Sequence, residues 1–278
     1  MTPDTIVIDE RLEEGAPIQW RLSQAHCNDD CAWYHGPRQY LRALGVAIGI
    51  GRDSSFLVHT LAEVARRGGF ERVLIPASAD CGTLAHVIAA YKDAGAPLGV
   101  TFVDRCATPV AINAWYARRS DVPIETHHVD ILDLALLTPV DVVCVHAFFG
   151  WFEPSARRQL VRKWYDLLRP GGVVITASSM RPRETTATVR VVGEERRAFM
   201  TRARRARNAA RDRFGIEPDT FDRWAEDFAR NKAHYPIPSE DEVHELFESS
   251  GFRVRQLFSV DGLGAADPRR IRLVAERI

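Results

Sequence analysis

Short runs of β-branched and apolar residues alternate with longer amphipathic segments along the middle of this chain. Five such runs are expected to be strands, at residues 72–78, 98–104, 124–130, 140–149 and 173–179. The run at 140–149 is apolar on both faces, as a central strand of a parallel sheet is. This alternation predicts a parallel sheet built from βαβ units, with the ligand site beyond the carboxyl ends of its strands.

Three further segments complete the expected architecture. The runs at 253–260 and 270–278 are expected to be the last two strands, and an arginine-rich helical stretch from about 193 to 232 follows the fifth strand. Acidic residues are interspersed in that stretch, so its arginines are expected to form a solvated helical face. The whole pattern predicts a Rossmann-like, doubly wound α/β fold with a mostly parallel seven-stranded sheet.

The ends of the repeating pattern suggest how the chain is divided. Residues 1–36 are rich in polar and turn-forming types, and apolar periodicity begins only near Pro37. We therefore expect an N-terminal helical cap or lid over residues 1–53 and a catalytic domain over 54–278. A helical insertion at about 181–238 follows the fifth strand of that domain.

The charge balance and the apolar content limit the classes of partner. Lysine and arginine together number 37, as do aspartate and glutamate, so the formal net charge is zero. No apolar run approaches the ~20 residues of a membrane-spanning helix, and the acidic start of the chain does not resemble a secretory signal. These features predict a cytoplasmic protein with a small-molecule substrate and without a nucleic-acid or membrane partner, while a homodimer stays open.

Small and acidic residues follow the first two expected strands, at the edge where a ligand should bind. The run Ala77-Ser78-Ala79-Asp80 leads from the first strand into a helix, and its small side chains let the backbone approach a ligand closely. Asp104 ends the second strand, where a carboxylate can accept two hydrogen bonds from a ribose diol. The same carboxylate could cap the next helix, and the two roles are compatible.

From residue 54 onward, the order of these elements resembles the class I S-adenosylmethionine-dependent methyltransferases. RVLIPASADCGT stands where that family has its glycine-rich first motif, and Asp104 where it has its ribose-binding acid. Asp130, in HHVDILDL, stands where the family has the acid beside the adenine amine, although a turn role for it stays open. DVVCVHAFFGWF matches the fourth strand and its loop, and LLRPGGVVITASS matches the Pro-Gly-Gly turn and the fifth strand.

The resemblance implies S-adenosyl-L-methionine as the cofactor. It implies cofactor contacts from Arg38, Ala77, Ser78, Asp80, Asp104, Arg105, Asp130, Ile131, His146, Ala147 and Phe148. Asp80 is expected to hold the cofactor's ammonium group. The first motif departs from the family, because Ala77, Ala79 and Cys81 occupy places usually given to glycine. Since a methyl group penalises positive φ, this loop is expected to keep φ below zero or to leave the methionine moiety farther away.

The loop after the fourth strand carries four aromatic residues and a histidine, at the expected junction of cofactor and substrate. Aromatic faces there could attract the sulfonium cation. Substrate contacts are expected from Phe149, Trp151, Asn231 and Tyr235. Catalytic roles are expected from His146, Tyr34 and Tyr235. Core packing of some of these aromatics, and a buried, satisfied His146, stay open as alternatives.

The N-terminal segment from His26 to His35 is dense in reactive side chains. Its two cysteines, Cys27 and Cys31, and its two histidines could in principle bind zinc, but the Cys-x3-Cys spacing is unusual for a structural site and no second pair follows. No metal is therefore predicted. The segment is expected to act as a lid that closes over the cofactor, unless its aromatic residues only attach the cap to the domain. The lid residues would be Trp33, Tyr34, His35, Arg38 and Tyr40.

The function that this pattern predicts is methyl transfer to a small molecule. Displacement at a carbon already activated by positive sulfur needs mainly alignment and exclusion of water. One alternative is an enzyme that cyclises the cofactor itself and releases methylthioadenosine. A nicotinamide-dependent oxidoreductase is opposed by the absence of Gly-x-Gly-x-x-Gly after the first strand. A non-catalytic nucleotide-binding module stays open.

Overall fold

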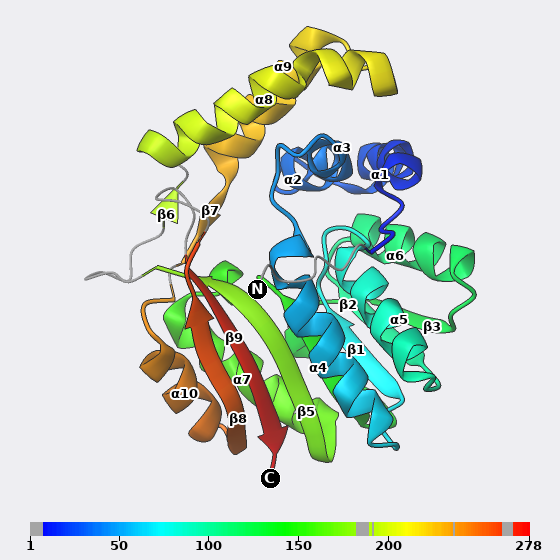
Figure 1. Cartoon of the computed structure of the whole chain (residues 1–278), viewed down its shortest axis with the longest axis vertical. Coiled ribbons are helices and arrows are strands. Elements are labelled where there is room, and N and C mark those ends of the chain that lie inside the picture. The colour runs from blue at the N-terminus through cyan, green and yellow to red at the C-terminus, as the bar shows by residue number, and fades with distance from the viewer. Residues whose placement is uncertain (1–7, 182–188, 191, 236, 263–268) are drawn as a thin grey trace.

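The computed structural model describes residues 8–181, 189–190, 192–235, 237–262 and 269–278. Within them, seven strands form one sheet in the order β3-β2-β1-β4-β5-β9-β8 (Figure 1). The strands are β1 (Arg72–Pro76), β2 (Gly99–Asp104), β3 (Ile124–His128), β4 (Val140–His146), β5 (Leu168–Met180), β8 (Phe252–Val260) and β9 (Arg269–Arg277). Only β9 runs antiparallel to its neighbours β5 and β8. The predicted fold class is confirmed, and the strand order reverses between β1 and β4, where a ligand crevice is expected.

Helices cover both faces of the sheet, and alternate residues of each strand contact them. The covering helices are α4 (Ser54–Arg66), α5 (Gly82–Ala94), α6 (Ala107–Arg119), α7 (Pro154–Leu167) and α10 (Glu240–Glu248). Val73 and Ile75 of β1 lie in a core shared with α4, α5 and α6, whereas Leu74 lies in a second core with α7 and α10. Successive side chains of a strand point to opposite faces, so a continuously apolar strand such as β1 needs helices on both sides.

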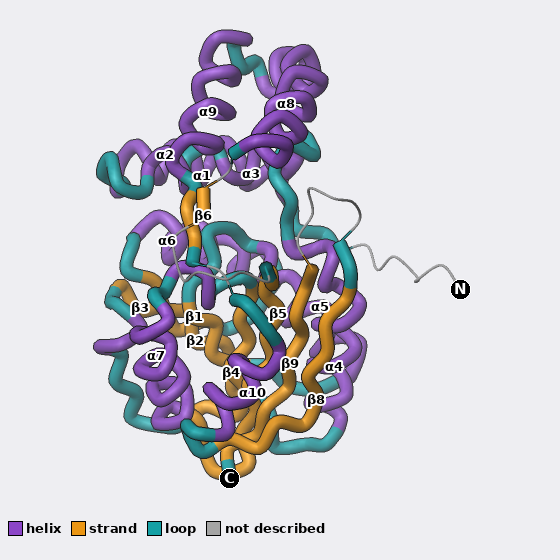
Figure 2. The backbone as a smooth tube through the Cα atoms, turned by 90° about the vertical axis from the view of Figure 1, so that its left-hand side faces the viewer, coloured by secondary structure: helices purple, strands orange, loops and turns teal. Residues whose placement is uncertain are grey.

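A third hydrophobic core lies outside the sheet and joins two segments that are far apart in the sequence. The N-terminal segment forms α1 (Leu12–His26), α2 (Ala32–His35), α3 (Arg38–Ala43) and a 3-10 turn (Ile50–Asp53). The insertion after β5 forms α8 (Gly193–Phe214) and α9 (Pro218–Asn231), and the short strands β6 (Val189–Arg190) and β7 (Ala233–His234) pair beside it. Leu41 from the first segment and Phe221 and Phe228 from the insertion are buried in one cluster. Figures 1 and 2 show these helices stacked above the carboxyl ends of the parallel strands.

The first helix of the N-terminal segment, α1, runs over fifteen residues from Leu12 to His26, although no apolar periodicity precedes Pro37 in the sequence. Its buried positions are Gly15, Ala16, Gln19 and Ser23, which are small or polar. A helix that buries such residues has no apolar stripe, so hydrophobic periodicity cannot reveal it. Tight contacts replace the stripe: a Cβ on Gly15 would meet the Gln39 side chain at 2.4 Å.

In the described part of the chain, three of the eight arginines of α8 have acidic partners on neighbouring helices. Arg196 pairs with Glu226, Arg213 pairs with Glu13, and the Nε of Arg207 lies 3.3 Å from Asp222. These partly exposed pairs agree with the predicted solvated face and contribute little stability each. Among the described helices, none is long and apolar enough to cross a membrane.

Candidate functional site

A cavity of about 800 Å³ lies over the carboxyl ends of the parallel strands. Ala77 after β1, Asp104 at the end of β2 and His146 at the end of β4 line it from the sheet side. Tyr34 lines it from the N-terminal segment, and Lys232 lines it from the insertion. The volume suits a nucleoside-sized ligand together with a small second molecule.

Most of the residues that the sequence singled out border this cavity. From the predicted cofactor set these are Arg38, Ala77, Ser78, Asp80, Asp104, Arg105, Asp130, Ile131, His146, Ala147 and Phe148. From the predicted substrate and catalytic sets they are Tyr34, Trp151 and Tyr235. Trp33 and His35 of the expected lid line it as well. The expectation that a ligand site lies beyond the carboxyl ends of the parallel strands therefore located the cavity. The roles of the individual residues stay predictions.

Three expected residues do not line the cavity. Phe149 is 2% exposed and packs against Trp164 and Phe247, because the 3-10 turn Phe149–Trp151 directs it into the second core. Asn231 ends α9 and is exposed to solvent. Tyr40, expected in the lid, is buried in the third core. The structure therefore does not support substrate contacts from Phe149 or Asn231. Tyr40 packs the N-terminal cap against the insertion and does not close over the cavity.

Two alanines at the strand ends adopt the left-handed conformation that glycine usually takes. Ala77 has φ 56° and Ala147 has φ 54°. The expectation that the first loop keeps φ below zero is therefore wrong at Ala77. Each backbone N–H donates to a neighbouring strand, that of Ala77 to Val103 and that of Ala147 to Ala177, both at 2.8 Å. These bonds hold a conformation that costs an alanine roughly 1–2 kcal/mol, so both turns take a shape that glycine usually adopts.

Asp80 is buried, and its carboxylate already has cationic partners. Its Oδ2 accepts from the Nε of Arg38 at 3.0 Å, and its Oδ1 lies 2.9 Å from Arg42 and accepts from the N–H of Gly82 at 2.9 Å. Burial alone would raise the pKa of Asp80, but Arg42 and Arg38 hold it below its usual range. The Asp80 carboxylate is therefore engaged by protein groups, and its bond to Arg38 orients that guanidinium beside the cavity.

The two acids expected to hold the adenosine also support their own turns. Asp104 is 9% exposed and its Oδ1 accepts from the N–H of Cys106 at 2.8 Å. Burial raises the pKa of Asp104 to about 6. Asp130 caps the turn Ile131–Asp133 by accepting from the N–H of Leu132 at 3.0 Å. A carboxylate has acceptor capacity for more than one partner, so both acids can support a turn and contact a ligand.

His146 belongs to a buried charged network that connects three distant parts of the chain. Its Nε2 lies 3.0 Å from Oδ2 of Asp53 and 2.9 Å from an amino group of Arg270. Asp53 is fully buried and also accepts from Arg270 and from Arg272, whose Nε lies at 3.0 Å. Burial lowers the pKa of His146 to about 4, although Asp53 opposes this, so the imidazole is neutral at pH 7.

The sequence interpretation missed this network, although β9 contains a signal for it. Ile271 and Leu273 face the second core, so Arg270 and Arg272 must point to the other side of the strand. Two arginines inside a buried strand require an acid opposite them. That acid, Asp53, lies next to the start of α4, at a position that the sequence assigned to the cap boundary.

The part of the cavity near the insertion is rich in cationic side chains. Arg52, Arg181, Arg202, Lys232 and Arg270 all border it. Burial lowers the pKa of Lys232 to about 8, with further lowering by Arg38, Arg181 and Arg270 and an opposing effect of Glu195. Glu195 pairs with Arg181 at 2.9 Å. This end of the cavity is therefore suited to a ligand with negative charge.

The aromatic residues that line the cavity differ in whether another protein group already binds their polar end. The rings of Tyr34 and Trp151 meet at 5.3 Å and join the N-terminal segment to the loop after β4. Arg38 stacks over Tyr34 at 5.3 Å. The hydroxyl of Tyr235 donates to Glu153 at 3.0 Å, so it has a partner other than a substrate. This geometry favours Tyr34 over Tyr235 for contact with a ligand.

Comparisons with known proteins agree with this geometry. Residues 79–172 match the family model of the methyltransferase domain. Carboxy-S-adenosyl-L-methionine synthase of Aeromonas hydrophila is 35% identical over 63 residues, which are 23% of this chain and 25% of that protein. The match thus spans about a quarter of that relative's length.

Solved structures with the same fold cover nearly the whole chain. Magnesium protoporphyrin IX methyltransferase from Synechocystis with bound SAH has a TM-score of 0.52 at 12% identity, over 86% of this chain and 94% of that one. The cyclase SpnF has a TM-score of 0.57 at 13% identity, over 93% of this chain and 96% of that one. At such identities the similarity concerns the fold.

Proposed function

We propose that this chain, a member of the class I S-adenosylmethionine-dependent methyltransferases, transfers the cofactor's methyl group to a small anionic molecule. The observation that carries the proposal is the composition of the cavity. Its sheet side presents the strand-end residues that match the family's cofactor motifs, and its insertion side is cationic. S-adenosylmethionine supplies a methyl group activated by positive sulfur, and the residues of this chain supply alignment and a dry, charged surrounding.

The cofactor half of the cavity fits the expected ligand. In this proposal Asp104, which borders the cavity, accepts hydrogen bonds from the ribose diol, and Asp130 with Ile131 contacts the adenine. Arg38 is fixed by Asp80 and can donate to a carboxylate. In this proposal Arg38, rather than Asp80, is the main charged contact of the methionine end.

The acceptor half determines the proposed substrate class. Arg202 lies on α8 and Lys232 at the end of α9, so the insertion brings positive charge to one end of the cavity. Arg270 of β9 borders the same end, but Asp53 already neutralises its charge. Like charges beside each other are unfavourable unless an anion lies between them, and a carboxylate or phosphate on the acceptor would supply that anion for Arg202 and Lys232.

His146 is the proposed base, and Asp53 is its positioning residue. Nε2 of His146 lies within hydrogen-bond distance of both Asp53 and the amino group of Arg270 that is bonded to Asp53. In this proposal His146 has the tautomer in which Nε2–H donates to Asp53, which leaves the lone pair on Nδ1. A neutral imidazole oriented by a buried carboxylate can accept a proton from the attacking group. The base is needed only if the acceptor atom carries a proton at pH 7.

The test of the cofactor site is Asp104→Asn, which keeps an oxygen for the N–H of Cys106 but removes the charge. Calorimetric titration with S-adenosylhomocysteine is expected to show at least tenfold weaker binding, or about 1.4 kcal/mol. Asp133→Asn, in the exposed turn beside Asp130, is the matched control and should bind as the wild type does. Equal affinities for all three proteins would count against the assignment.

A second candidate is chemistry on the cofactor itself, which the short match to carboxy-S-adenosyl-L-methionine synthase favours. Product analysis separates the two. Incubation with S-adenosylmethionine alone that yields methylthioadenosine indicates cyclisation, and a carboxylated cofactor formed with a carboxylate donor indicates carboxyl transfer. S-adenosylhomocysteine that forms in proportion to a methylated acid or phosphate supports methyl transfer. If none of these products formed with any acceptor, the remaining interpretation would be a non-catalytic nucleotide-binding module.

A further inference from the structure

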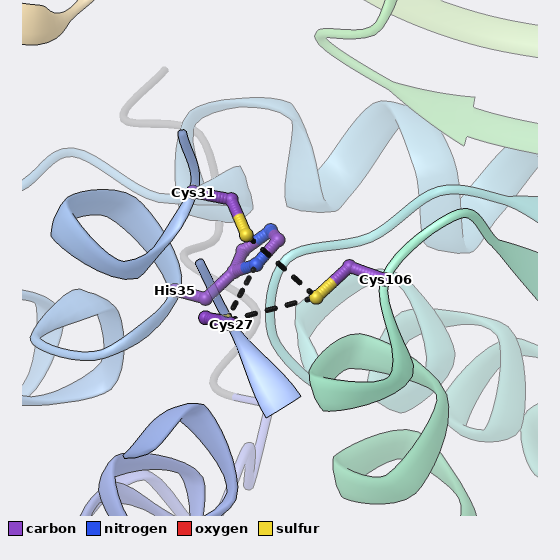
Figure 3. Close-up of side chains that lie close together, drawn as sticks. All are labelled: Cys27, Cys31, His35 and Cys106. Atoms are coloured by element: carbon purple, nitrogen blue, oxygen red, sulfur yellow. Dashed lines mark hydrogen bonds between the residues drawn. The ribbon is translucent and has the colours of Figure 1, made fainter. Parts of the chain in front are cut away.

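Three cysteines and one histidine from two distant segments converge at the wall of the cavity. Cys27 follows α1, Cys31 precedes α2, His35 ends α2, and Cys106 precedes α6. Figure 3 shows the first three, from the N-terminal segment, facing Cys106 on the loop after β2. One ligand atom from each of the four lies within 4.8 Å of all the others.

We propose that Cys27, Cys31, His35 and Cys106 bind one zinc ion, which ties the N-terminal helices to the loop that carries Asp104. The set is three thiols and one imidazole, a combination that zinc favours in structural sites. The proposal concerns a site separate from the proposed methyl transfer and does not rest on it.

The distances between the side chains match tetrahedral zinc. Zinc–sulfur bonds of about 2.3 Å in a tetrahedron place neighbouring sulfurs about 3.8 Å apart. The Sγ atoms of Cys27 and Cys106 are 3.6 Å apart, and those of Cys31 and Cys106 are 3.9 Å apart. The Sγ of Cys27 lies 3.6 Å from Nδ1 of His35. A disulfide would need sulfurs at about 2.05 Å, so these sulfurs are not bonded to one another, and their spacing fits ligands around one ion.

The surroundings also suit a bound ion. His35 and Cys106 are each 9% exposed, and the other two cysteines are partly buried. The hydroxyl of Thr108 lies 3.2 Å from the sulfur of Cys27 and can donate to a thiolate there. Three thiolates and one zinc leave a single negative charge, and Arg105 and Arg38 lie close enough to act electrostatically on His35. Zinc binding would release the thiol protons, since thiolates are the ligands.

The sequence prediction of no metal overlooked Cys106 because it comes 75 residues after Cys31. A search for a second local pair cannot find a single ligand on another element. Both His26 and His35 were candidates, and the structure brings His35 close to the three cysteines. Four protein ligands close the coordination sphere, so the ion would be structural and not catalytic.

The role that follows is control of the Asp104 loop. Asp104 accepts from the N–H of Cys106, so a zinc ion on the Cys106 sulfur would restrain both residues. The same ion would hold α2, whose Tyr34 lines the cavity. Metal occupancy would therefore fix the N-terminal segment against the cofactor half of the site.

The test measures zinc in the full chain after purification without chelator and under reducing conditions. Elemental analysis is expected to give one zinc per chain, and replacement by Co²⁺ is expected to give the thiolate charge-transfer band and intense visible bands of a tetrahedral site. Cys31→Ser should retain at least fivefold less zinc while keeping its circular dichroism. Cys144→Ala, which removes a buried cysteine of β4 outside the cluster, is the matched control and should retain the ion.

Two results for the wild-type protein would overturn the proposal, and neither depends on activity or on cofactor affinity. One is wild-type protein that holds less than about a tenth of an equivalent of zinc both as purified and after reconstitution with zinc under reductant. The other is mass spectrometry of alkylated, non-reduced protein that finds a disulfide between two of Cys27, Cys31 and Cys106 and no metal. Retention of zinc by Cys31→Ser at the wild-type level would also contradict this ligand set.

Discussion

The cofactor half and the acceptor half of the cavity are built in different ways. In the cofactor half, the functional side chains also support turns of their own segment: Asp104 accepts from Cys106, and Asp130 accepts from Leu132. In the acceptor half, the charged groups come from distant elements: Asp53 contacts both His146 and Arg270, and Arg270 lies 217 positions after it in the sequence. The two acids of the first half are therefore positioned by their own segments, whereas the charged network of the second half forms only once the chain has folded.

The comparison predicts that the acceptor half is the more sensitive to a single lost charge. Asp53→Asn keeps the shape of the side chain but leaves Arg270 and Arg272 without their buried carboxylate. The free energy of unfolding is expected to fall by about 3–5 kcal/mol in urea titrations. Asp93→Asn, which removes an exposed partner of Arg66 away from the cavity, is the control for the loss of one charge and should cost less than about 1 kcal/mol. Similar losses in the two variants would contradict the structural role of the buried Asp53 carboxylate.

A change on the cationic wall should affect the acceptor and not the cofactor. Arg202→Ala removes a cavity-lining charge, and the KM for an anionic acceptor is expected to rise about tenfold, because a charged hydrogen bond contributes about 1.5–3 kcal/mol. Binding of S-adenosylhomocysteine should be unchanged. Arg205→Ala, on the exposed side of the same helix, is the control. If Arg202→Ala weakened cofactor binding as much as acceptor binding, the division into two halves would be wrong.

The smallest expected effect is a pH dependence confined to the cofactor half. The pKa of Asp104 is raised to about 6 by burial, so lowering the pH protonates a carboxylate that is ionised at pH 7. A raised pKa in an acid means that the charged, accepting form is lost below pH 6. Affinity for S-adenosylhomocysteine should therefore fall about fourfold between pH 7 and pH 5.5 in the wild type.

In Asp104→Asn the same pH interval should change the affinity little, since the titrating group is gone. Isothermal titration at the two pH values measures both proteins. A wild-type fall that persists unchanged in the variant would assign the pH dependence to another group.

What the sequence could predict follows the same division. Strand positions and strand-end residues were predictable because parallel strands are continuously apolar and their loops carry the site. Helix α1 could not be predicted from apolar periodicity, because it buries Gly15, Ala16 and Gln19 instead of an apolar stripe. Contacts that depend on tertiary packing, such as Asp53 with Arg270 or Cys106 with Cys31, leave no local spacing to detect.

The family motif also misled at one point for a physical reason. Glycine is usual in the first loop because positive φ is required there, and alanine suggested that the requirement had been relaxed. Ala77 nevertheless has φ 56°, and its N–H bond to Val103 holds it. A residue's conformational preference can thus be overridden where neighbouring strands determine the backbone.

The most direct test of the two-halves account is a crystal structure with S-adenosylhomocysteine bound. The account predicts ribose hydroxyls within hydrogen-bond distance of the Asp104 carboxylate, with the sulfur directed past Tyr34 towards His146 and the cationic wall beyond it. An adenosyl group bound among Arg202, Lys232 and Arg270, with Asp104 making no contact to it, would contradict the account.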